Sequence, residues 1–131
     1  DICTSIIGWT DRLSNVLPPI ALNAADSRWP PSVEADDVVF EAVLAANILH
    51  IAPIDVLQGL LAGSSRVLRP GGFLFIYGPF SVAGEQLSEG NAKFDLKLKA
   101  VNADWGLREL NEVETAADSA GFSLLAVEEM P

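Results

Sequence analysis

The polar residues best suited to chemistry lie at the predicted ends of two apolar strands. Asn47 ends the first strand, residues 38–47, and His50 lies just past it, while Tyr77 closes the second strand, residues 73–77. His50 is the only histidine of the chain, and imidazole is the side chain that transfers protons most readily near neutral pH. It could equally cap the following helix or fill space. Tyr77 could direct its hydroxyl at a ligand or cover the core with its ring.

A second group of candidates lies in or after the long polar segment that follows the second strand. Asn91 and Asp95 precede Trp105 and Arg108. Asp95 is an alternative to His50 as a general base, because a carboxylate can also accept a proton. Trp105 and Arg108 could form one wall of a substrate pocket. The competing interpretation is that Trp105 packs within the loop and that Arg108 is a surface cation. For Arg108 considered by itself, the surface cation is the favoured interpretation.

Several catalytic and binding motifs are absent from the sequence. There is no GxGxxG or GxxxxGK[ST] loop for phosphates, and no HExxH, CxxC or EF-hand pattern for a metal. No GxSxG elbow is present, which argues against an α/β-hydrolase. No YxxxK pattern begins at Tyr77, and this weakens the interpretation of the chain as a short-chain dehydrogenase. The sequence therefore predicts no protein-bound metal.

The elements that position these residues form a strand, a helix and a strand. Residues 38–47 are apolar with a β-branched start, and residues 73–77 are a continuous apolar run. Between them, apolar residues recur near the helical period up to Leu68, with Pro53 suited to the first helical position. Pro70, Gly71 and Gly72 end that helix. Because ligands bind beyond the carboxyl ends of parallel strands, Asn47, His50 and Tyr77 should lie at one site.

The remaining segments extend the alternation of helix and strand. We predict helices at residues 3–14, 92–101 and 109–120, the last ended by Gly121, and strands at 20–24 and 122–127. Residues 26–37, with two adjacent prolines, and residues 81–90 should be loops, the first with room for a helical turn. The expected fold is α/β: a doubly wound, mostly parallel sheet with helices on both faces, forming one domain over residues 1–131.

Composition limits the classes of partner. The chain has 131 residues, 50% of them hydrophobic, yet no apolar run approaches the roughly 18 residues that span a membrane. The net charge of −10, from 8 basic and 18 acidic residues, argues against nucleic acid as a partner. The single cysteine, Cys3, cannot form an internal disulfide, which fits a reducing compartment and a cytoplasmic location.

Longer motifs resemble a known family. They are SIIGW at 5–9, NVLPPIALNA at 15–24, AANILHIAP at 45–53, GLLAGSSRVLRPGGFLFIYGPF at 59–80, GNAKFDLKLKAVNADWGLRE at 90–109 and the closing EEMP. With these motifs the chain resembles the DUF938 or methyltransferase-like 26 group of the class I S-adenosylmethionine-dependent methyltransferase superfamily. The YGPF, N-x-x-FD and WGLR elements are the most specific, whereas RPGG is a common turn.

The resemblance implies a seven-stranded sheet with S-adenosylmethionine over the strand ends and a small molecule as methyl acceptor. Asp1 corresponds to the acid that binds the ribose hydroxyls. Asn23, with Ala24, corresponds to the residues near the adenine, although the family usually has aspartate at position 23. Asn47 and His50 lie beside the cofactor. The family's first strand and glycine-rich loop would precede Asp1, and its last strand would follow Pro131, so the chain resembles a methyltransferase domain shortened at both ends.

A second hypothesis belongs to a different class of function. A sheet that lacks strands exposes an edge and an apolar face, and such surfaces drive association. The chain could therefore be a non-catalytic interaction domain that forms homo-oligomers and has lost the cofactor loop. A nucleotide-dependent oxidoreductase is supported only by analogy of fold.

Overall fold

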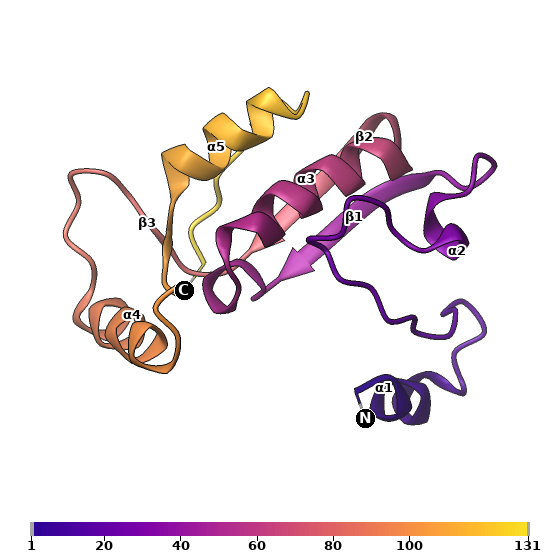
Figure 1. Cartoon of the computed structure of the whole chain (residues 1–131), viewed down its shortest axis with the longest axis horizontal. Coiled ribbons are helices and arrows are strands. Elements are labelled where there is room, and N and C mark those ends of the chain that lie inside the picture. Colours follow the sequence, from indigo (N-terminus) through magenta and orange to yellow (C-terminus); the bar gives the residue numbers. More distant parts are fainter. Residues whose placement is uncertain (1, 131) are drawn as a thin grey trace.

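The computed structural model describes residues 2–130 and combines helices with two small parallel sheets (Figure 1). The architecture is of the α/β type that the alternation of strand and helix signals predicts. In chain order the elements are α1 (Ile2–Thr10), α2 (Pro31–Glu34), β1 (Phe40–Ala46), the 3₁₀ turn η1 (Leu49–Ile51), α3 (Ile54–Val67), β2 (Leu68–Tyr77), β3 (Phe80–Ser81), α4 (Glu89–Val101), β4 (Arg108–Glu109) and α5 (Leu110–Ser119).

The strands β1 and β2 form the larger sheet, and α3 connects them. They run parallel, with Ala42 opposite Phe73 and Ala46 opposite Tyr77. Both strands therefore end at the same edge of the sheet, as the sequence predicts. Pro53 is the N-cap of α3 and so stands one residue before the helical position predicted for it.

Only one face of this sheet is covered among residues 2–130. Val43 and Ile76 are partly buried and pack against the core, which includes Leu57, Leu60, Leu61 and Val67 of α3. Their neighbours Leu44 and Phe75 point to the opposite face, where they are 70% and 54% exposed. The expectation of helices on both faces is therefore met on one face of the described sheet, and the other face is apolar and open.

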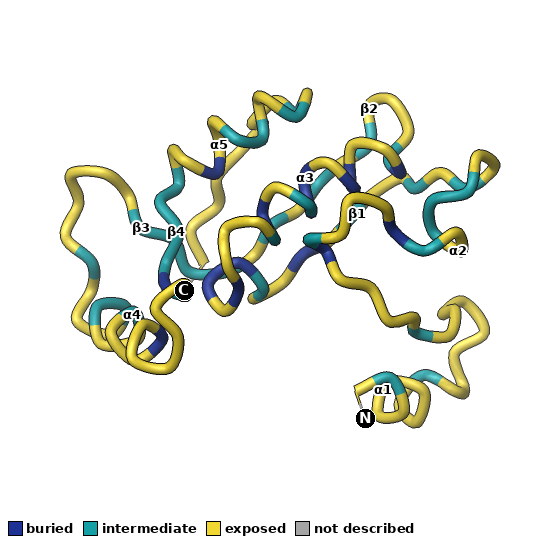
Figure 2. Tube along the Cα trace, in the orientation of Figure 1, coloured by how far each residue is buried: buried dark blue, intermediate teal, exposed yellow. Residues whose placement is uncertain are grey.

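The core is centred on α3 (Figure 2). The loop before β1 packs against this helix through Ala24 and Trp29, which are 7% and 8% exposed. Gly59 and Gly63 make this close approach possible, because a Cβ on either would fall within 2.3 Å of loop atoms. From the other side α5 contributes Val113. The apolar side chains of α3 in the core are Leu57, Leu60, Leu61 and Val67.

The start of β2 differs from the prediction. β2 begins at Leu68, directly after α3, instead of at Phe73. The register slips between Phe40, which faces Leu68, and Ala42, which faces Phe73. Residues 69–72 therefore bulge out of the ladder, and Gly71 supplies the positive φ of 75° that this bulge requires. The helix ends at Val67, close to the predicted Leu68, but the Pro-Gly-Gly segment does not end it: residues 70–72 lie within β2, after the strand has begun.

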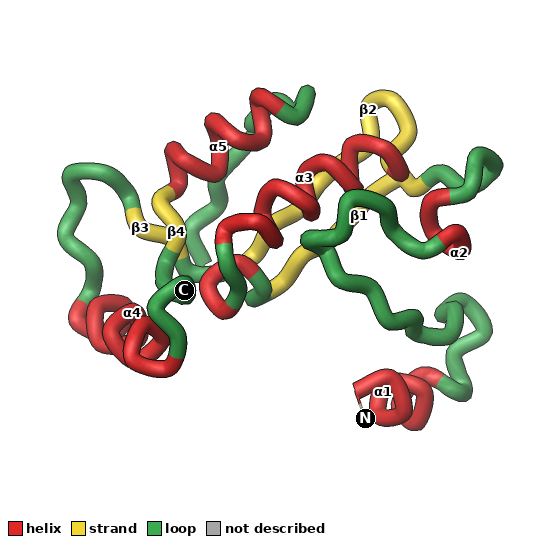
Figure 3. The backbone as a smooth tube through the Cα atoms, in the orientation of Figure 1, coloured by secondary structure: helices red, strands yellow, loops and turns green. Residues whose placement is uncertain are grey.

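The two outer strands predicted from the sequence are absent from the described chain. Residues 20–24 and 122–127 are irregular, and Figure 3 draws both as loop. The reason is the same for both: an apolar run needs a neighbouring strand to form a ladder, and its composition alone does not create one. In the first segment the carbonyl of Ala24 instead accepts a bond from the Trp29 indole at 3.5 Å. In the second, Leu124 and Leu125 are exposed.

The helices near the carboxyl end follow the predictions closely. α4 begins at Glu89, three residues before the predicted start, because the Ser88 hydroxyl accepts a bond from the Asn91 N–H at 3.2 Å and caps the helix. α5 ends before Gly121, whose φ of 88° fits the expected C-terminal glycine. Between the two helices, β4 pairs with β3 and places Arg108 opposite Phe80.

A last feature of the helices is their length and apolarity. None of those within residues 2–130 combines the length and apolarity needed to cross a bilayer.

Candidate functional site

Asn47 closes the larger sheet at its carboxyl edge. Its N–H donates to the Tyr77 carbonyl at 2.8 Å, one residue beyond the end of β1. Its φ of 56° lies in the left-handed region, which asparagine tolerates better than most residues. The chain therefore turns sharply after the sheet, and the Asn47 side chain is left exposed at the strand end. Tyr77, 49% exposed, lies on the adjacent strand.

His50 follows this turn on η1 and is 6% exposed. Its ring meets the Phe94 ring of α4 edge-on, with centroids 5.4 Å apart and planes at 64°. The ring also lies near Gly78, where an added Cβ would stand 3.4 Å from the His50 Nδ1 and 3.7 Å from the Asn47 Oδ1. The glycine thus leaves a small space between two polar side chains at the strand ends. Neither ring nitrogen of His50 has a hydrogen-bond partner within residues 2–130.

The environment keeps His50 uncharged. Burial lowers the pKa of the imidazole from its ordinary value, because the charged form loses hydration. A neutral imidazole at physiological pH can accept a proton, which is what a general base must do. The prediction that His50 is placed for proton transfer is therefore compatible with its protonation state.

This lowered pKa makes stability depend on pH. The unfolded chain binds a proton on His50 below a pH of about 6.5, whereas the folded chain does so only at lower pH. The unfolding free energy should therefore fall as the pH drops below about 6.5. Urea unfolding at pH 7.5 and 5.5 measures this fall, and His50→Gln should show a smaller one. Equal falls in both proteins would contradict the assignment, since the carboxylates titrate alike in each.

Asp95 lies on α4 near the same turn but is fully engaged. Its Oδ1 accepts the Leu107 N–H at 2.8 Å and its Oδ2 accepts the Lys99 ammonium at 2.5 Å. Burial raises the pKa of this carboxyl, but the bonds from Lys99 and Leu107 outweigh that effect, so the net pKa is lowered. A carboxylate stabilised in its charged form is a weak base. Of the two predicted bases, His50 fits proton acceptance better.

The other predicted substrate residues differ in their contacts. The Arg108 guanidinium donates to three backbone carbonyls: Leu49 in η1 at 3.2 Å, Ala52 directly after η1, and Asp104 at 2.9 Å. Trp105 is partly buried, and its backbone N–H donates to the Asn102 carbonyl at 3.0 Å. Asn91 lies in the first turn of α4 and is held there by the Ser88 cap. Arg108 is thus a structural cross-link and not a free surface cation.

The residues predicted to hold the adenosine lie elsewhere or outside the described chain. Asp1 is outside the described residues. Asn23 is occupied locally: its Nδ2 donates to Asp26 at 2.9 Å and its Oδ1 accepts the Ala25 N–H at 3.2 Å. Ala24 packs on α3 against Gly59. At the strand ends, the Asn47 and Tyr77 side chains are exposed, and a Cβ on Gly78 would make ordinary contacts with Asn47 and His50.

Sequence reasoning missed two contributors to this region. Phe94 supplies the ring beside His50, and Gly106 donates its N–H to the His50 carbonyl at 3.1 Å. The signal for Gly106 was the glycine between Trp105 and Leu107, because a glycine inside an otherwise bulky run marks close backbone approach. Phe94 belongs to the N-x-x-FD motif, but helical periodicity does not distinguish its role beside His50 from that of a core residue.

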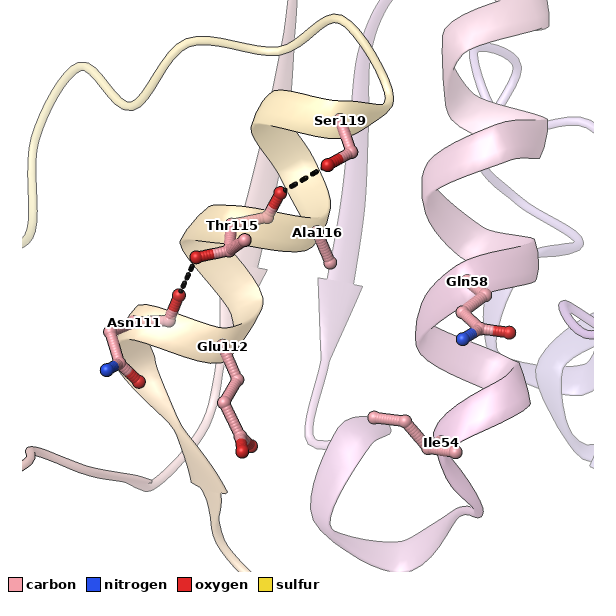
Figure 4. Close-up of a pocket in the computed structure, with 7 residues that line it drawn as sticks. All are labelled: Ile54, Gln58, Asn111, Glu112, Thr115, Ala116 and Ser119. Atoms are coloured by element: carbon pink, nitrogen blue, oxygen red, sulfur yellow. Dashed lines mark hydrogen bonds between the residues drawn. The ribbon is translucent and has the colours of Figure 1, made fainter.

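A separate groove lies between α3 and α5 and has a volume of about 460 Å³ (Figure 4). None of the predicted site residues lines it. The Thr115 and Ser119 hydroxyls donate to carbonyls one turn earlier in α5, at 2.7 and 2.9 Å. Their protons are therefore used within the helix. The groove is lined by Ile54, Gln58, Asn111, Glu112, Thr115, Ala116 and Ser119.

Two findings bear on cofactor and family. Within residues 2–130, no three His, Cys, Asp or Glu side chains gather as ligands for a metal ion. A family model with the description "Protein of unknown function (DUF938)" matches residues 1–131.

Proposed function

The chain belongs to the DUF938 family, and on this premise we propose that it acts in S-adenosylmethionine-dependent methyl transfer to a small molecule. The observation that carries the proposal is the group at the carboxyl edge of β1 and β2, where Asn47 and His50 flank Gly78 and the Tyr77 carbonyl binds the Asn47 N–H. Parallel sheets bind ligands at such edges. The proposal also draws on the motif resemblance to the methyltransferase superfamily.

The chemistry requires little from the protein beyond alignment. S-adenosylmethionine supplies a methyl group on a sulfonium, so the bond from the acceptor atom to the methyl carbon forms as the carbon–sulfur bond breaks and leaves its electron pair on sulfur. Holding reactants in line accounts for much of the rate in such reactions. Asn47 and Tyr77 would bind and orient at the strand ends. His50, which is neutral, would take the proton that the acceptor loses.

Calorimetric titration tests the proposal. Protein expressed from the complete reading frame is titrated with S-adenosylmethionine and, separately, with its demethylated product. We expect saturable heat with one site per chain and a raised Tm, because a ligand that binds only the folded state stabilises it. The proposal would be contradicted if both ligands gave no heat of binding and no thermal shift.

The open sheet face favours one alternative. Leu44, Phe75 and Tyr77 expose apolar surface on the side of the sheet that α3 does not cover, and such a patch is typical of an association surface. A non-catalytic domain of this kind would form homo-oligomers and bind neither cofactor nor product. The same titration, combined with light scattering, separates the two: heat from a monomer supports methyl transfer, and an oligomer without heat supports the alternative.

A further inference from the structure

The turn that carries His50 depends on hydrogen bonds from outside itself. η1 has three residues, no side-chain cap, and one backbone bond at its end, from the Ile51 N–H to the Ile48 carbonyl at 3.3 Å. Short 3₁₀ turns have poor hydrogen-bond geometry and leave carbonyls without partners. The carbonyls of Leu49, His50 and Ala52 must therefore be satisfied by other groups, or the turn would be unstable where it is buried.

One short segment supplies all three donors. The Arg108 Nε donates to the Leu49 carbonyl at 3.2 Å, and its Nη2 donates to the Ala52 carbonyl. Between them, the Gly106 N–H donates to the His50 carbonyl at 3.1 Å. The planar guanidinium spans two carbonyls three residues apart, which an ammonium cannot do with the same geometry.

This segment, residues 104–108, is itself held in place. The Leu107 N–H donates to Asp95, and the Arg108 Nη2 also donates to the Asp104 carbonyl at 2.9 Å. Gly106 has a φ of 147°, and a Cβ there would lie 2.8 Å from Asp95 Oδ1 and from Lys99 Cε. The pairing of β4 with β3 anchors Arg108 opposite Phe80, two residues after Gly78. Contacts thus connect α4 and β3 to both sides of the His50 turn.

By contrast, the imidazole is held only by packing. Among residues 2–130 its one aromatic ring contact is with the edge of Phe94, and its nitrogens have no hydrogen-bond partner. The position of the ring therefore depends on the backbone of η1, which fixes the Cα, and on packing against Phe94. We infer that Arg108 is a positioning residue that fixes His50 at the strand ends, and not a substrate-binding residue.

The inference rests on the proposed function in one respect: that function supplies the ligand that His50 would contact. If Arg108 had only a structural role, replacing it would lower the free energy of unfolding without a specific effect on His50. A positioning Arg108 instead changes the surroundings of one imidazole. The charged groups that the contacts connect to this turn are Arg108 on β4 and the Asp95–Lys99 pair on α4, and Tyr77 is the titratable group at the end of β2.

Proton NMR of His50 provides the test, because the chain has one histidine and its Hε1 resonance needs no assignment. We compare wild type with Arg108→Gln and Arg108→Lys. In Arg108→Gln the pKa of His50 should rise toward about 6.5, since a loosened turn lets water reach the ring. Arg108→Lys should give a smaller rise, because lysine reaches one carbonyl and keeps the charge.

The matched control is Arg66→Gln. Arg66 also makes a side-chain ion pair, with Glu34, but it lies on α3 away from the turn. Its loss should lower stability and leave the pKa of His50 unchanged. An unchanged His50 pKa in the folded Arg108→Gln protein would overturn the inference. If that variant does not fold, an unchanged pKa in Arg108→Lys would overturn it.

The proposed function is judged separately. Wild type and Arg108→Lys are titrated calorimetrically with the demethylated product of S-adenosylmethionine, and the affinity of the variant should fall about 10-fold, or about 1.4 kcal/mol. A His50 pKa that responds to Arg108 in a protein that binds no product supports the positioning role and contradicts methyl transfer. If the product binds but the pKa of His50 does not change in the Arg108 variants, methyl transfer is supported and the positioning role is contradicted.

Discussion

Gly59→Ala should lower the free energy of unfolding by about 3 kcal/mol, the upper part of the range for overpacked cores. A Cβ at this position would lie 2.1 Å from the Ala24 carbonyl oxygen and 2.6 Å from the Ala25 Cα. These are backbone atoms and cannot rotate away, so the loop must leave α3 or the helix must shift. Because Ala24 and Trp29 belong to the core, either change exposes apolar surface.

Urea unfolding of the variant measures this loss. Gly63→Ala should behave similarly, because its Cβ would lie 2.2 Å from the Trp29 ring. The matched control is Gly90→Ala in α4, which is also a helical glycine but has no atom within 4 Å of an added Cβ. It should be as stable as wild type or slightly more so, because alanine favours helix. Equal stabilities of Gly59→Ala and Gly90→Ala would show that the loop does not pack on α3.

Gly78→Ala should weaken the binding of S-adenosylmethionine at least about 10-fold, or about 1.4 kcal/mol. Its Cβ would fill the space between the Asn47 Oδ1 and the His50 Nδ1, at 3.7 and 3.4 Å. Those are ordinary contact distances, and the φ of Gly78 is not positive, so the fold should tolerate the substitution. The variant therefore separates loss of a binding space from loss of structure.

Calorimetry and thermal unfolding are compared for this variant and for Gly90→Ala. We expect the Tm of both to stay near that of wild type and only Gly78→Ala to lose affinity. Wild-type affinity in Gly78→Ala would mean that the ligand does not use the strand-end space. A large fall in its Tm would mean that residue 78 has a structural role.

The β-α-β unit was predictable because its signals agree at every level. The apolar runs of β1 and β2, the helical spacing in α3 and the Pro-Gly-Gly segment all indicate the same unit. The edge with Asn47, His50 and Tyr77 follows directly from that topology. The predicted strands at 20–24 and 122–127 were wrong because an apolar segment forms a strand only beside a partner, and composition does not reveal whether the partner is there.

The role of Arg108 could not be predicted from the sequence. Its contacts with Leu49 and Ala52 span 59 and 56 residues, and no local pattern encodes such pairs. The same holds for Asp95, whose lowered pKa depends on Leu107, twelve residues away, as well as on Lys99. His50 was identifiable by its chemistry and its place after a strand. The groups that position it come from the distant segment of residues 94–108.

The most direct test of the strand-end site follows the Hε1 resonance of His50 while the demethylated product of S-adenosylmethionine is added. Since His50 is the only histidine, each change reports on this one position. We expect a saturable shift with one product per chain, reached at a higher concentration in Gly78→Ala. A resonance that stays unmoved in wild type, at concentrations that saturate any calorimetric binding, would contradict a cofactor site at the ends of β1 and β2.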